Sequence, residues 1–378
     1  VDPWAANLEK RLHEAGDAEG LTVRRYPGNL LFEPEAIHNQ SGKPFQVFTP
    51  FWKHCRRRPE PGLPTDAPES IRFGKAPMGD SLDDWLLLPR NPDWASHWPE
   101  LWQPGEPGAR DRLAAFLDGG VSDYREGRNH PAKYATSRLS PHMHFGEISP
   151  RTVWHALRSH GMAPGADEAE TDFFLSEMGW REFSHHLLFH FPHLPEKPFK
   201  PRFEQFPWRG ERAHLTAWQR GQTGYPIVDA GMRELWHTGY MHNRVRMIVA
   251  SFLTKHLLLP WRAGENWFWD TLLDADLANN AAGWQWVAGS GADAAPYFRI
   301  FNPTLQGEKF DAEGEYVRHW VPEIAGLPDK FLHRPAEAPQ EMLDAAGVEL
   351  GVDYPLPIVD HKQARESALA AYKATADG

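Results

Sequence analysis

The chain has 378 residues, of which 41% are hydrophobic, and its 17 tryptophans and 21 phenylalanines supply enough apolar surface for a large buried core. Its single cysteine, Cys55, excludes intrachain disulfides and zinc sites built from several cysteines, and no apolar run approaches the ~20 residues that span a bilayer. We therefore expect a globular, cytoplasmic protein without a membrane segment.

The net charge of −11 disfavours a nucleic-acid surface over the whole molecule. Its distribution is uneven, because residues 177–262 hold twelve Lys or Arg against seven Asp or Glu. A basic stretch on an acidic chain is typical of a phosphate-binding surface, and it is also typical of solvated helix faces. Charge alone leaves both interpretations open.

The first 32 residues predict a helix with Leu8 and Leu12 on one face, followed by a short strand at 21–23. One helix and one strand cannot form a sheet, and the chain opens at Val1 without an initiator Met. We interpret residues 1–33 as the remnant of an α/β domain whose earlier strands are missing from this sequence.

Residues 34–105 are predicted to be a connector between domains. Ten prolines lie between Pro59 and Pro107, with few periodic apolar positions, so this stretch should be irregular and should carry no chemistry. Residues 106–378 are predicted to be one large all-helical domain. Helical spacing of apolar residues marks five segments within it, at 149–161, 171–191, 227–237, 242–259 and 362–372.

No Gly-rich nucleotide fingerprint or Walker loop is present, which removes support for nicotinamide dehydrogenases and P-loop enzymes. His186 and His190 lie one helical turn apart beside His185, but no further ligand completes a metal site in the sequence. We interpret them as core or surface histidines and predict no metal.

Residues 136–140 (Thr-Ser-Arg-Leu-Ser) place three hydroxyls and a guanidinium in a turn that enters a helix at Pro141. Such a turn suits a pyrophosphate, because helix N-termini and hydroxyls donate to phosphate oxygens. Helix capping by Ser140 is the alternative interpretation.

Two helical faces combine polar and aromatic groups. Glu177, Trp180 and Arg181 share one face at spacings of three and four residues, which suits an unstacked base. Asn243 and Met247 lie four apart, joining an amide to a polarizable thioether. Each feature taken singly is also typical of ion pairs or of core packing.

Residues 274–286 combine two acids, three side-chain amides, small residues and two tryptophans. Small side chains allow a planar ligand close to the backbone, and carboxylates can accept from hydroxyl or ring N–H donors. Core packing would also use the tryptophans, but beside several polar groups each buried polar atom needs a partner. The segment is therefore our main prediction for a cofactor pocket.

Five motifs together identify a resemblance: 136–140, Trp-Arg-Glu-Phe at 180–183, Thr-Gly-Tyr-Pro-Ile-Val-Asp-Ala at 223–230, Met-His-Asn-Arg at 241–244, and 274–286. They resemble the DNA photolyase and cryptochrome family, most closely the bacterial class I cyclobutane pyrimidine dimer photolyases. The resemblance runs in order from about Val47 to the C-terminus. It implies a mainly α fold, with a helical FAD-binding domain preceded by a remnant of the α/β antenna domain.

The resemblance also implies a FAD site in a defined set of residues. Asp274 is implied to pair with Arg246, and Asn280 to face flavin N5. The implied cofactor-binding residues are Tyr124, Thr136, Ser137, Arg138, Leu139, Ser140, Trp180, Arg246, Asp274, Ala275, Asp276 and Asn280. A second antenna chromophore, a folate or a deazaflavin, is implied for the family, with its site largely absent from this chain.

The implied substrate is UV-damaged DNA, flipped into the pocket and repaired by an electron from light-excited reduced FAD. The implied catalytic residues are Glu177, Asn280, Trp284, Trp261 and Trp208, of which the last three form an electron-transfer chain. The implied DNA-binding residues are Arg128, Glu177, Trp180, Arg181, Asn243, Arg244, Met247, Trp286 and Gln306. We expect a monomer without an obligate protein partner.

Two related functions remain as alternatives. A cryptochrome-like photoreceptor would share the fold and flavin without repair, but the chain holds repair-type residues at Glu177, Asn243, Met247 and Asn280. A (6-4) photolyase resembles His-His where this chain has His242-Asn243. The resemblance therefore favours a dimer photolyase.

Overall fold

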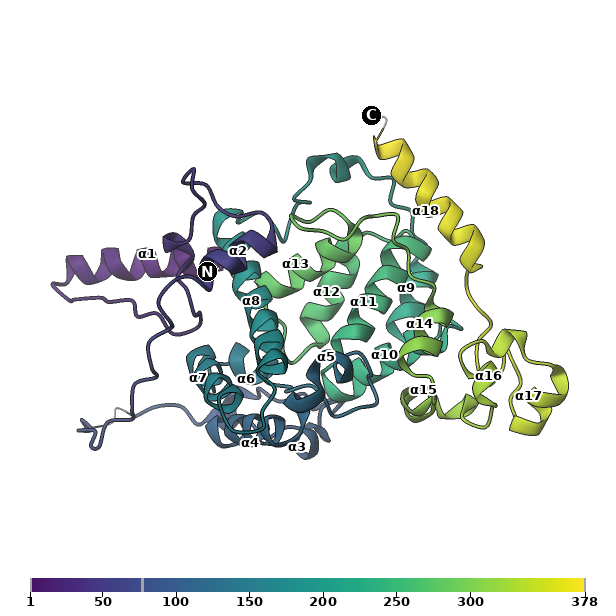
Figure 1. Ribbon diagram of the computed structural model, residues 1–378, viewed down its shortest axis with the longest axis horizontal. Helices are drawn as coiled ribbons and strands as arrows, with labels where there is room; N and C mark the ends of the chain where they lie inside the picture. The colour runs from purple at the N-terminus through teal and green to yellow at the C-terminus, as the bar shows by residue number, and fades with distance from the viewer. Residues whose placement is uncertain (1, 76–77, 377–378) are drawn as a thin grey trace.

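The computed structural model describes residues 2–75 and 78–376, and throughout these ranges the regular elements are helices (Figure 1). The single β pairing within them is an isolated bridge between Leu350 and Tyr354. None of the described helices is long and apolar enough to cross a bilayer. The predicted mainly helical fold class is confirmed.

The α-helices run in sequence order around the body of the molecule (Figure 1): α1 (Pro3–Ala18), α2 (Phe48–Cys55), α3 (Trp98–Leu101), α4 (Glu106–Asp118), α5 (Tyr124–Gly127), α6 (Ser140–His144), α7 (Pro150–Gly161), α8 (Glu168–His190), α9 (Arg212–Gln219), α10 (Pro226–Thr238), α11 (Asn243–Ser251), α12 (Trp261–Thr271), α13 (Leu277–Ala288), α14 (Pro303–Phe310), α15 (Glu315–Trp320), α16 (Asp329–Leu332), α17 (Gln340–Ala346) and α18 (His361–Ala376). Short 3-10 turns lie at Pro34–Ala36, Leu82–Trp85, Gly120–Asp123, Pro201–Gln205, Pro322–Ile324 and Pro335–Glu337.

Four of the five predicted helices are confirmed with small shifts of their ends, and α7 shows why the pattern works. Ser149 is its N-cap, with a hydroxyl that accepts from the Arg151 N–H at 3.1 Å, and Pro150 opens the first turn. The helix ends at Gly161, as the sequence predicts. Helix α8 starts earlier than predicted because Asp167 caps it by accepting from the Ala169 N–H.

The prediction of one α-helix over 242–259 is wrong in its second half. Helix α11 ends at Ser251 and continues as a π-helix, η5 (Phe252–His256). The π-helix includes buried Lys255, whose Nζ donates to the Arg299 carbonyl at 2.9 Å. Burial lowers the pKa of Lys255 to about 8.

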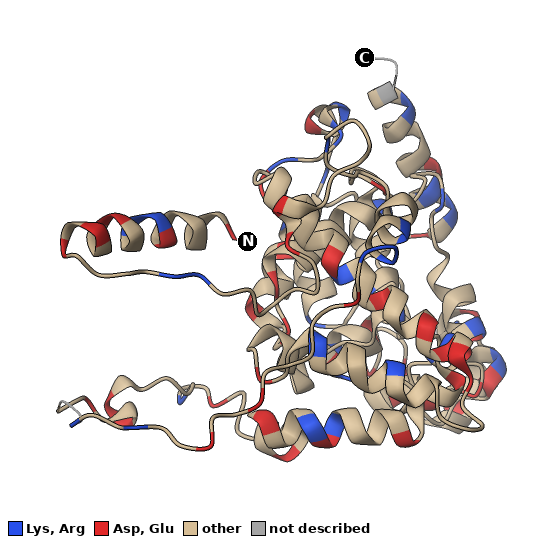
Figure 2. Cartoon of the chain, turned by 60° about the vertical axis from the view of Figure 1, so that its left-hand side comes forward, with Lys and Arg blue, Asp and Glu red and all other residues tan. Residues whose placement is uncertain are grey.

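The N-terminal segment stands away from the helical body. Figures 1 and 2 show α1 and the connector as two arms on the same side of the molecule. The strand predicted at 21–23 does not form, because no neighbouring strand lies within the described residues to pair with it. Val23 instead folds back onto Gly16, where an added Cβ would lie 2.5 Å from its Cγ2.

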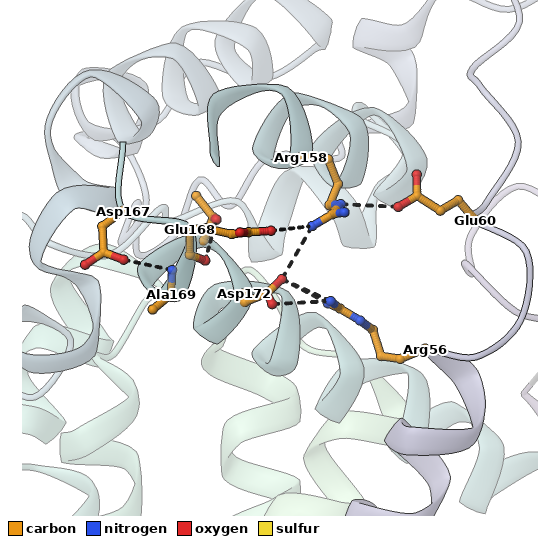
Figure 3. Close-up of polar contacts among 8 residues, drawn as sticks. Arg56, Glu60, Arg158, Asp167, Glu168, Ala169 and Asp172 are labelled. Atoms are coloured by element: carbon orange, nitrogen blue, oxygen red, sulfur yellow. Dashed lines mark hydrogen bonds and ion pairs between the residues drawn. The ribbon is translucent and has the colours of Figure 1, made fainter. Parts of the chain in front are cut away.

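The connector is irregular over 59–75 and 78–97 apart from one 3-10 turn, as its prolines predict. Helices α2 and α3, which periodicity did not predict, lie within the stretch assigned to it. Polar contacts fasten its start to the body (Figure 3): Arg158 on α7 pairs with Glu60 at 3.2 Å, and Arg56 on α2 pairs with Asp172 on α8 at 3.1 Å. Asp172 also lies 3.7 Å from Arg158, so the two pairs form one network.

The core is divided into clusters that share the long helices. The largest is built from α10 to α13 and the C-terminal helices, a second from α4 to α8, and a third from α2, the end of α8 and the start of α13. Helix α8 therefore contributes to two clusters, and α13 passes beside it in the centre of Figure 1. This arrangement brings polar positions of α8, α11 and α13 around one space.

A buried carboxylate joins the C-terminal segment to α10. Asp229 is fully buried and accepts from the Thr223 N–H and hydroxyl at 2.7 Å each, from the Gly224 N–H at 3.0 Å and from the Tyr354 hydroxyl at 2.6 Å. Its four donors satisfy the lone pairs of both oxygens.

We expect Asp229→Ala to destabilise the protein by about 3 kcal/mol, because several buried donors lose their acceptor at once. Urea unfolding of the purified protein measures the change. Asp353→Ala is the matched control, since the exposed Asp353 carboxylate accepts from only the Glu349 N–H. Equal losses in the two variants would contradict the importance assigned to burial.

Candidate functional site

A cavity of about 540 Å³ lies between α8, α11 and α13. Its walls combine charged, amide and aromatic side chains with the small residues of α13. Thirteen of the residues that the sequence analysis singled out line it: Arg128, Glu177, Trp180, Asn243, Arg244, Arg246, Met247, Asp274, Ala275, Asp276, Asn280, Trp284 and Trp286. The fold thus brings motifs about 150 residues apart into one wall.

Asp274 connects two distant segments at the cavity wall. Its Oδ2 accepts from Arg246 Nη2 at 2.8 Å and from the Ser140 hydroxyl at 2.6 Å, while its Oδ1 is buried without a hydrogen-bond partner. Burial disfavours the Arg246 cation, but the Asp274 carboxylate outweighs it and raises the pKa of Arg246. The Arg246 cation is therefore stabilised, and Asp274 Oδ1 is left as an acceptor for a ligand donor.

Asp276 caps α13 and contacts α8. Its Oδ1 accepts from the Asn279 N–H at 2.8 Å and from the Asn279 amide at 2.6 Å, and its Oδ2 lies 3.5 Å from His185 Nε2. Burial lowers the pKa of His185 to about 4. Although burial opposes ionisation of Asp276, its partners lower the pKa of that carboxyl, so it stays charged.

Asn280 is oriented by its neighbour on α12. Its Nδ2 donates to the Glu265 carbonyl at 2.9 Å, which leaves Oδ1 as the amide atom free to accept from a ligand. Helix packing sets this contact: Trp284, one turn further along α13, lies against Gly264, where an added Cβ would come within 2.1 Å of the indole. Glycine at 264 therefore allows the close approach of α12 and α13.

Glu177 and Arg128 form an ion pair on the cavity wall. The Arg128 guanidinium also lies over the rings of Tyr124 and Phe173, at 5.4 and 5.5 Å from their centroids. Tyr124 itself is buried beneath Arg128 and does not line the cavity. Burial raises the pKa of its hydroxyl, so Tyr124 stays neutral and supports the cation.

The α11 residues of the cavity are fixed by the first turn of that helix. His242 is the N-cap and accepts from the Arg244 N–H at 3.2 Å. The Arg244 side chain bonds Asn129, lies over the Phe310 ring at 4.4 Å and reaches Met247 Sδ at 4.0 Å. Arg244 therefore joins α11 to the turn after α5 and to the end of α14 at the cavity.

The 136–140 segment lies outside the cavity lining. Arg138 adopts a left-handed backbone with φ of 51°, which is costly for a residue other than glycine, and buried Leu139 occupies the N-cap position of α6. The interpretation of Ser140 as a helix cap is wrong, because its hydroxyl donates to Asp274 instead. Thr136, Ser137 and Arg138 are half-buried in the same turn.

Two predicted DNA contacts lie elsewhere. Arg181 points away from the cavity, with its guanidinium donating to the Asn29 carbonyl at 2.7 Å and the Asn29 side chain at 2.6 Å. Helical spacing predicted that Arg181 and Glu177 share one face of α8. However, other segments contact α8 on several sides, and the N-terminal segment contacts the side that carries Arg181. Gln306 lies half-buried on α14, outside the lining.

The three predicted electron-transfer tryptophans share one apolar cluster. Trp284 and Trp261 are buried within it, and Trp208 is half-buried against it, with its ring 4.4 Å from that of Phe206. Trp284 also touches Phe268 edge-on at 5.0 Å. The three tryptophans therefore share one apolar cluster, with Trp284 on the cavity wall and Trp208 at the partly exposed edge of the cluster.

The structure adds residues that sequence reasoning missed. Asn129 and Asp293 line the cavity, and Glu265 touches Asn280 only through its backbone carbonyl. No local pattern marks them, since each owes its position to the packing of distant segments. In the described residues the histidines of α8 form no metal cluster; His186 accepts from the Phe45 N–H, and His190 bonds the Pro34 carbonyl.

Comparison with known proteins places these features in a family. Residues 174–374 match the family described as the FAD binding domain of DNA photolyase, and residues 1–69 match the family described as DNA photolyase. The deoxyribodipyrimidine photo-lyase of Agrobacterium fabrum is 56% identical over 99% of this chain and 78% of its own length. Cryptochrome-1 of Arabidopsis thaliana is 40% identical over 96% of this chain and 54% of its own.

A solved structure gives the same result. A bacterial class III photolyase from Agrobacterium tumefaciens superposes with a TM-score of 0.97 and 55% identity, covering all of this chain and 78% of its own. The family predicted from the motifs is therefore confirmed. The narrower prediction of class I is not confirmed, because this relative is described as class III.

Glu265 carries a carboxyl that burial holds neutral. Its Oε1 has no hydrogen-bond partner, and burial, opposed only by Arg262, raises its pKa to about 8. In the unfolded chain the carboxyl has its usual pKa near 4.3. Between these values the folded protein holds a proton that the unfolded chain has released, so stability falls as pH rises through this window.

We expect Glu265→Gln to be as stable as the original protein at pH 4.5 and more stable at pH 8.5, by on the order of 2 kcal/mol. Urea unfolding at both values, with equal flavin content, measures the difference. Asp270→Asn is the control for loss of one negative charge on α12, because Asp270 is exposed. If the difference in unfolding free energy between Glu265→Gln and the original protein were the same at both pH values, a neutral Glu265 carboxyl would be ruled out.

Proposed function

The chain belongs to the DNA photolyase and cryptochrome family, and from that premise we propose that it uses FAD and light to repair cyclobutane pyrimidine dimers in UV-damaged DNA. One observation carries the proposal: a single cavity is lined by Asp274 and Asn280, which suit a flavin, and also by Glu177 with the rings of Trp180 and Trp286. Relatives named deoxyribodipyrimidine photo-lyase, at 56% and 43% identity, support the activity.

The residues of the cavity fit FAD. Buried Asp274 Oδ1 and Asn280 Oδ1 are acceptors without a donor, and Ala275, Ala282 and Gly283 leave room for a planar ring beside the backbone. We assign further flavin contacts to Arg246 and Asp276, which line the cavity. The 136–140 turn lies outside the lining and is assigned only support of Asp274 through Ser140. When bound, reduced FAD supplies the light-driven electron that opens the cyclobutane ring.

The cavity residues around Glu177 are proposed to bind the flipped dimer. Glu177 would accept from the dimer, with its carboxylate held by Arg128, while Trp180 and Trp286 wall the pocket and Met247 packs on it. Asn243 and Arg244 would contact the DNA around the lesion. Arg181 is left out of this proposal because Asn29 occupies its guanidinium.

Several narrower assignments follow. We infer a class III type for the chain, from the 55% identical relative described so. A folate or deazaflavin antenna and a DNA contact by Gln306 remain proposals from the family resemblance. Action as a monomer and a cytoplasmic location remain proposals as well.

Light-dependent repair tests the proposal. The purified chain with photoreduced flavin should restore intact thymines in a thymine-dimer oligonucleotide under blue light and not in darkness, as measured by chromatography of the product. Binding of the damaged oligonucleotide without restoration in light would favour the photoreceptor alternative. Repair of (6-4) photoproducts alone would favour the (6-4) photolyase alternative.

In the same assay, Glu177→Ala should lower repair by about tenfold, because a hydrogen bond to a charged group is lost. Its flavin absorption should be retained, since Glu177 pairs with Arg128 whereas Asp274 is held by Arg246 and Ser140. Glu168→Ala is the matched control on α8, where Glu168 pairs with Arg158 outside the cavity. Loss of flavin from Glu177→Ala would show that its role is misplaced.

We infer that Trp284, Trp261 and Trp208 carry electrons inward when oxidised flavin is photoreduced. Trp284→Phe should then slow photoreduction by about tenfold or more, followed by flavin absorbance under continuous blue light. Repair after chemical reduction should be nearly unchanged, because the tryptophans are not needed in that step. Equal photoreduction rates in the two proteins would exclude this chain of residues.

A further inference from the structure

The wall residue Trp180 is part of a stack of three nearly parallel rings. Its indole lies 3.8 Å from the Phe48 ring centroid at an interplanar angle of 10°, and Phe48 lies 6.4 Å from Trp52 at 13°. Phe48 and Trp52 are one turn apart on α2. A short helix from the predicted connector therefore supports a ring of the proposed lesion pocket.

The stack has only one side open to the cavity. Trp180 lines the cavity, whereas buried Phe48 and half-buried Trp52 do not. Phe48 consequently covers the face of Trp180 that is turned away from the cavity. Phe183 fixes the assembly from the side, with its ring edge-on to both Phe48 and Trp180 at 6.0 Å.

Two further contacts hold α2 in this position. The Phe48 N–H donates to Asp293 Oδ2 at 3.0 Å, and Asp293 lies on the rim of the cavity. Trp52 rests on Gly179 of α8, where an added Cβ would come within 2.6 Å of the indole. The start of α2 is thus tied to the cavity rim and its second turn to the helix that carries Trp180.

We propose that Phe48 is a positioning residue for lesion binding, acting through Trp180; this rests on the proposed function. A tryptophan with a free back face can adopt other side-chain rotamers, and ordering it on binding would weaken the complex. With Phe48 stacked behind it, the Trp180 ring is already oriented to receive an unstacked base on its open face. Undamaged duplex DNA inserts no base into the cavity, so its affinity does not depend on the orientation of Trp180.

Three variants test the proposal. Phe48→Leu keeps an apolar side chain but removes the planar ring, and Phe48→Tyr keeps the ring. Phe51→Leu is the matched control, because Phe51 is a fully buried residue of the same helix whose ring contacts Phe183 and His186 instead. All three are compared as full chains with bound flavin.

The measurement is the ratio of dark dissociation constants for an undamaged oligonucleotide and its thymine-dimer counterpart. Phe48→Leu should lower this preference by about tenfold, the size expected when base stacking is impaired. Its flavin absorption and its repair rate at saturating damaged DNA should change much less. Phe48→Tyr should restore the preference, and Phe51→Leu should lower the unfolding temperature while leaving the preference intact.

An unchanged preference in Phe48→Leu, or an equal loss in Phe51→Leu, would overturn the proposal while leaving the proposed function in place. Failure of the original protein to prefer damaged DNA would overturn the proposed function and this inference together. A crystal structure of Phe48→Leu without DNA gives an independent readout. Several orientations of Trp180 would support the positioning role, and one unchanged orientation would contradict it.

Discussion

The buried carboxylate of Asp274 is the contact on which the site depends. It joins Arg246 on α11 and Ser140 on α6 to the turn before α13, three segments that no local pattern would bring together. A buried ion pair is weak evidence for stability, since removing charges from water costs several kcal/mol per ion. Its retention here is better explained by the free acceptor it offers to a ligand. Burial of the Asp274 carboxylate therefore costs electrostatic free energy, but it holds a hydrogen-bond acceptor for the ligand in one place.

The sequence predicted the helical class, the helices with clear caps and most of the cavity lining. Helical spacing correctly predicted that Glu177 and Trp180 share the face of α8 that lines the cavity. The motif 274–286 was also informative, because several of its residues contact one another. Spacing failed for Arg181, because helical periodicity identifies a shared face only within about a turn and cannot tell which neighbour that face meets. The motifs, rather than periodicity, supplied the identities of the partners.

What the sequence could not predict depended on segments far apart. The π-helix at Phe252–His256 follows no propensity rule, and α2 was hidden in a proline-rich stretch that predicted only a connector. The Phe48–Trp180 stack joins residues 132 positions apart and requires both Gly179 and Asp293 to be in place. Such contacts are set by tertiary packing, which single-sequence reasoning does not reach.

The network around Arg158 and Asp172 has a consequence for the connector. Its ion pairs are partly exposed, so dissolved salt screens them, whereas the aromatic clusters of the body are insensitive to ionic strength. High salt should loosen the stretch that follows α2 while the body remains folded, as a local opening rather than global unfolding. The proline-rich arm would then become the first substrate for a protease, and cleavage there would separate α1 and α2 from the chain that carries the cavity.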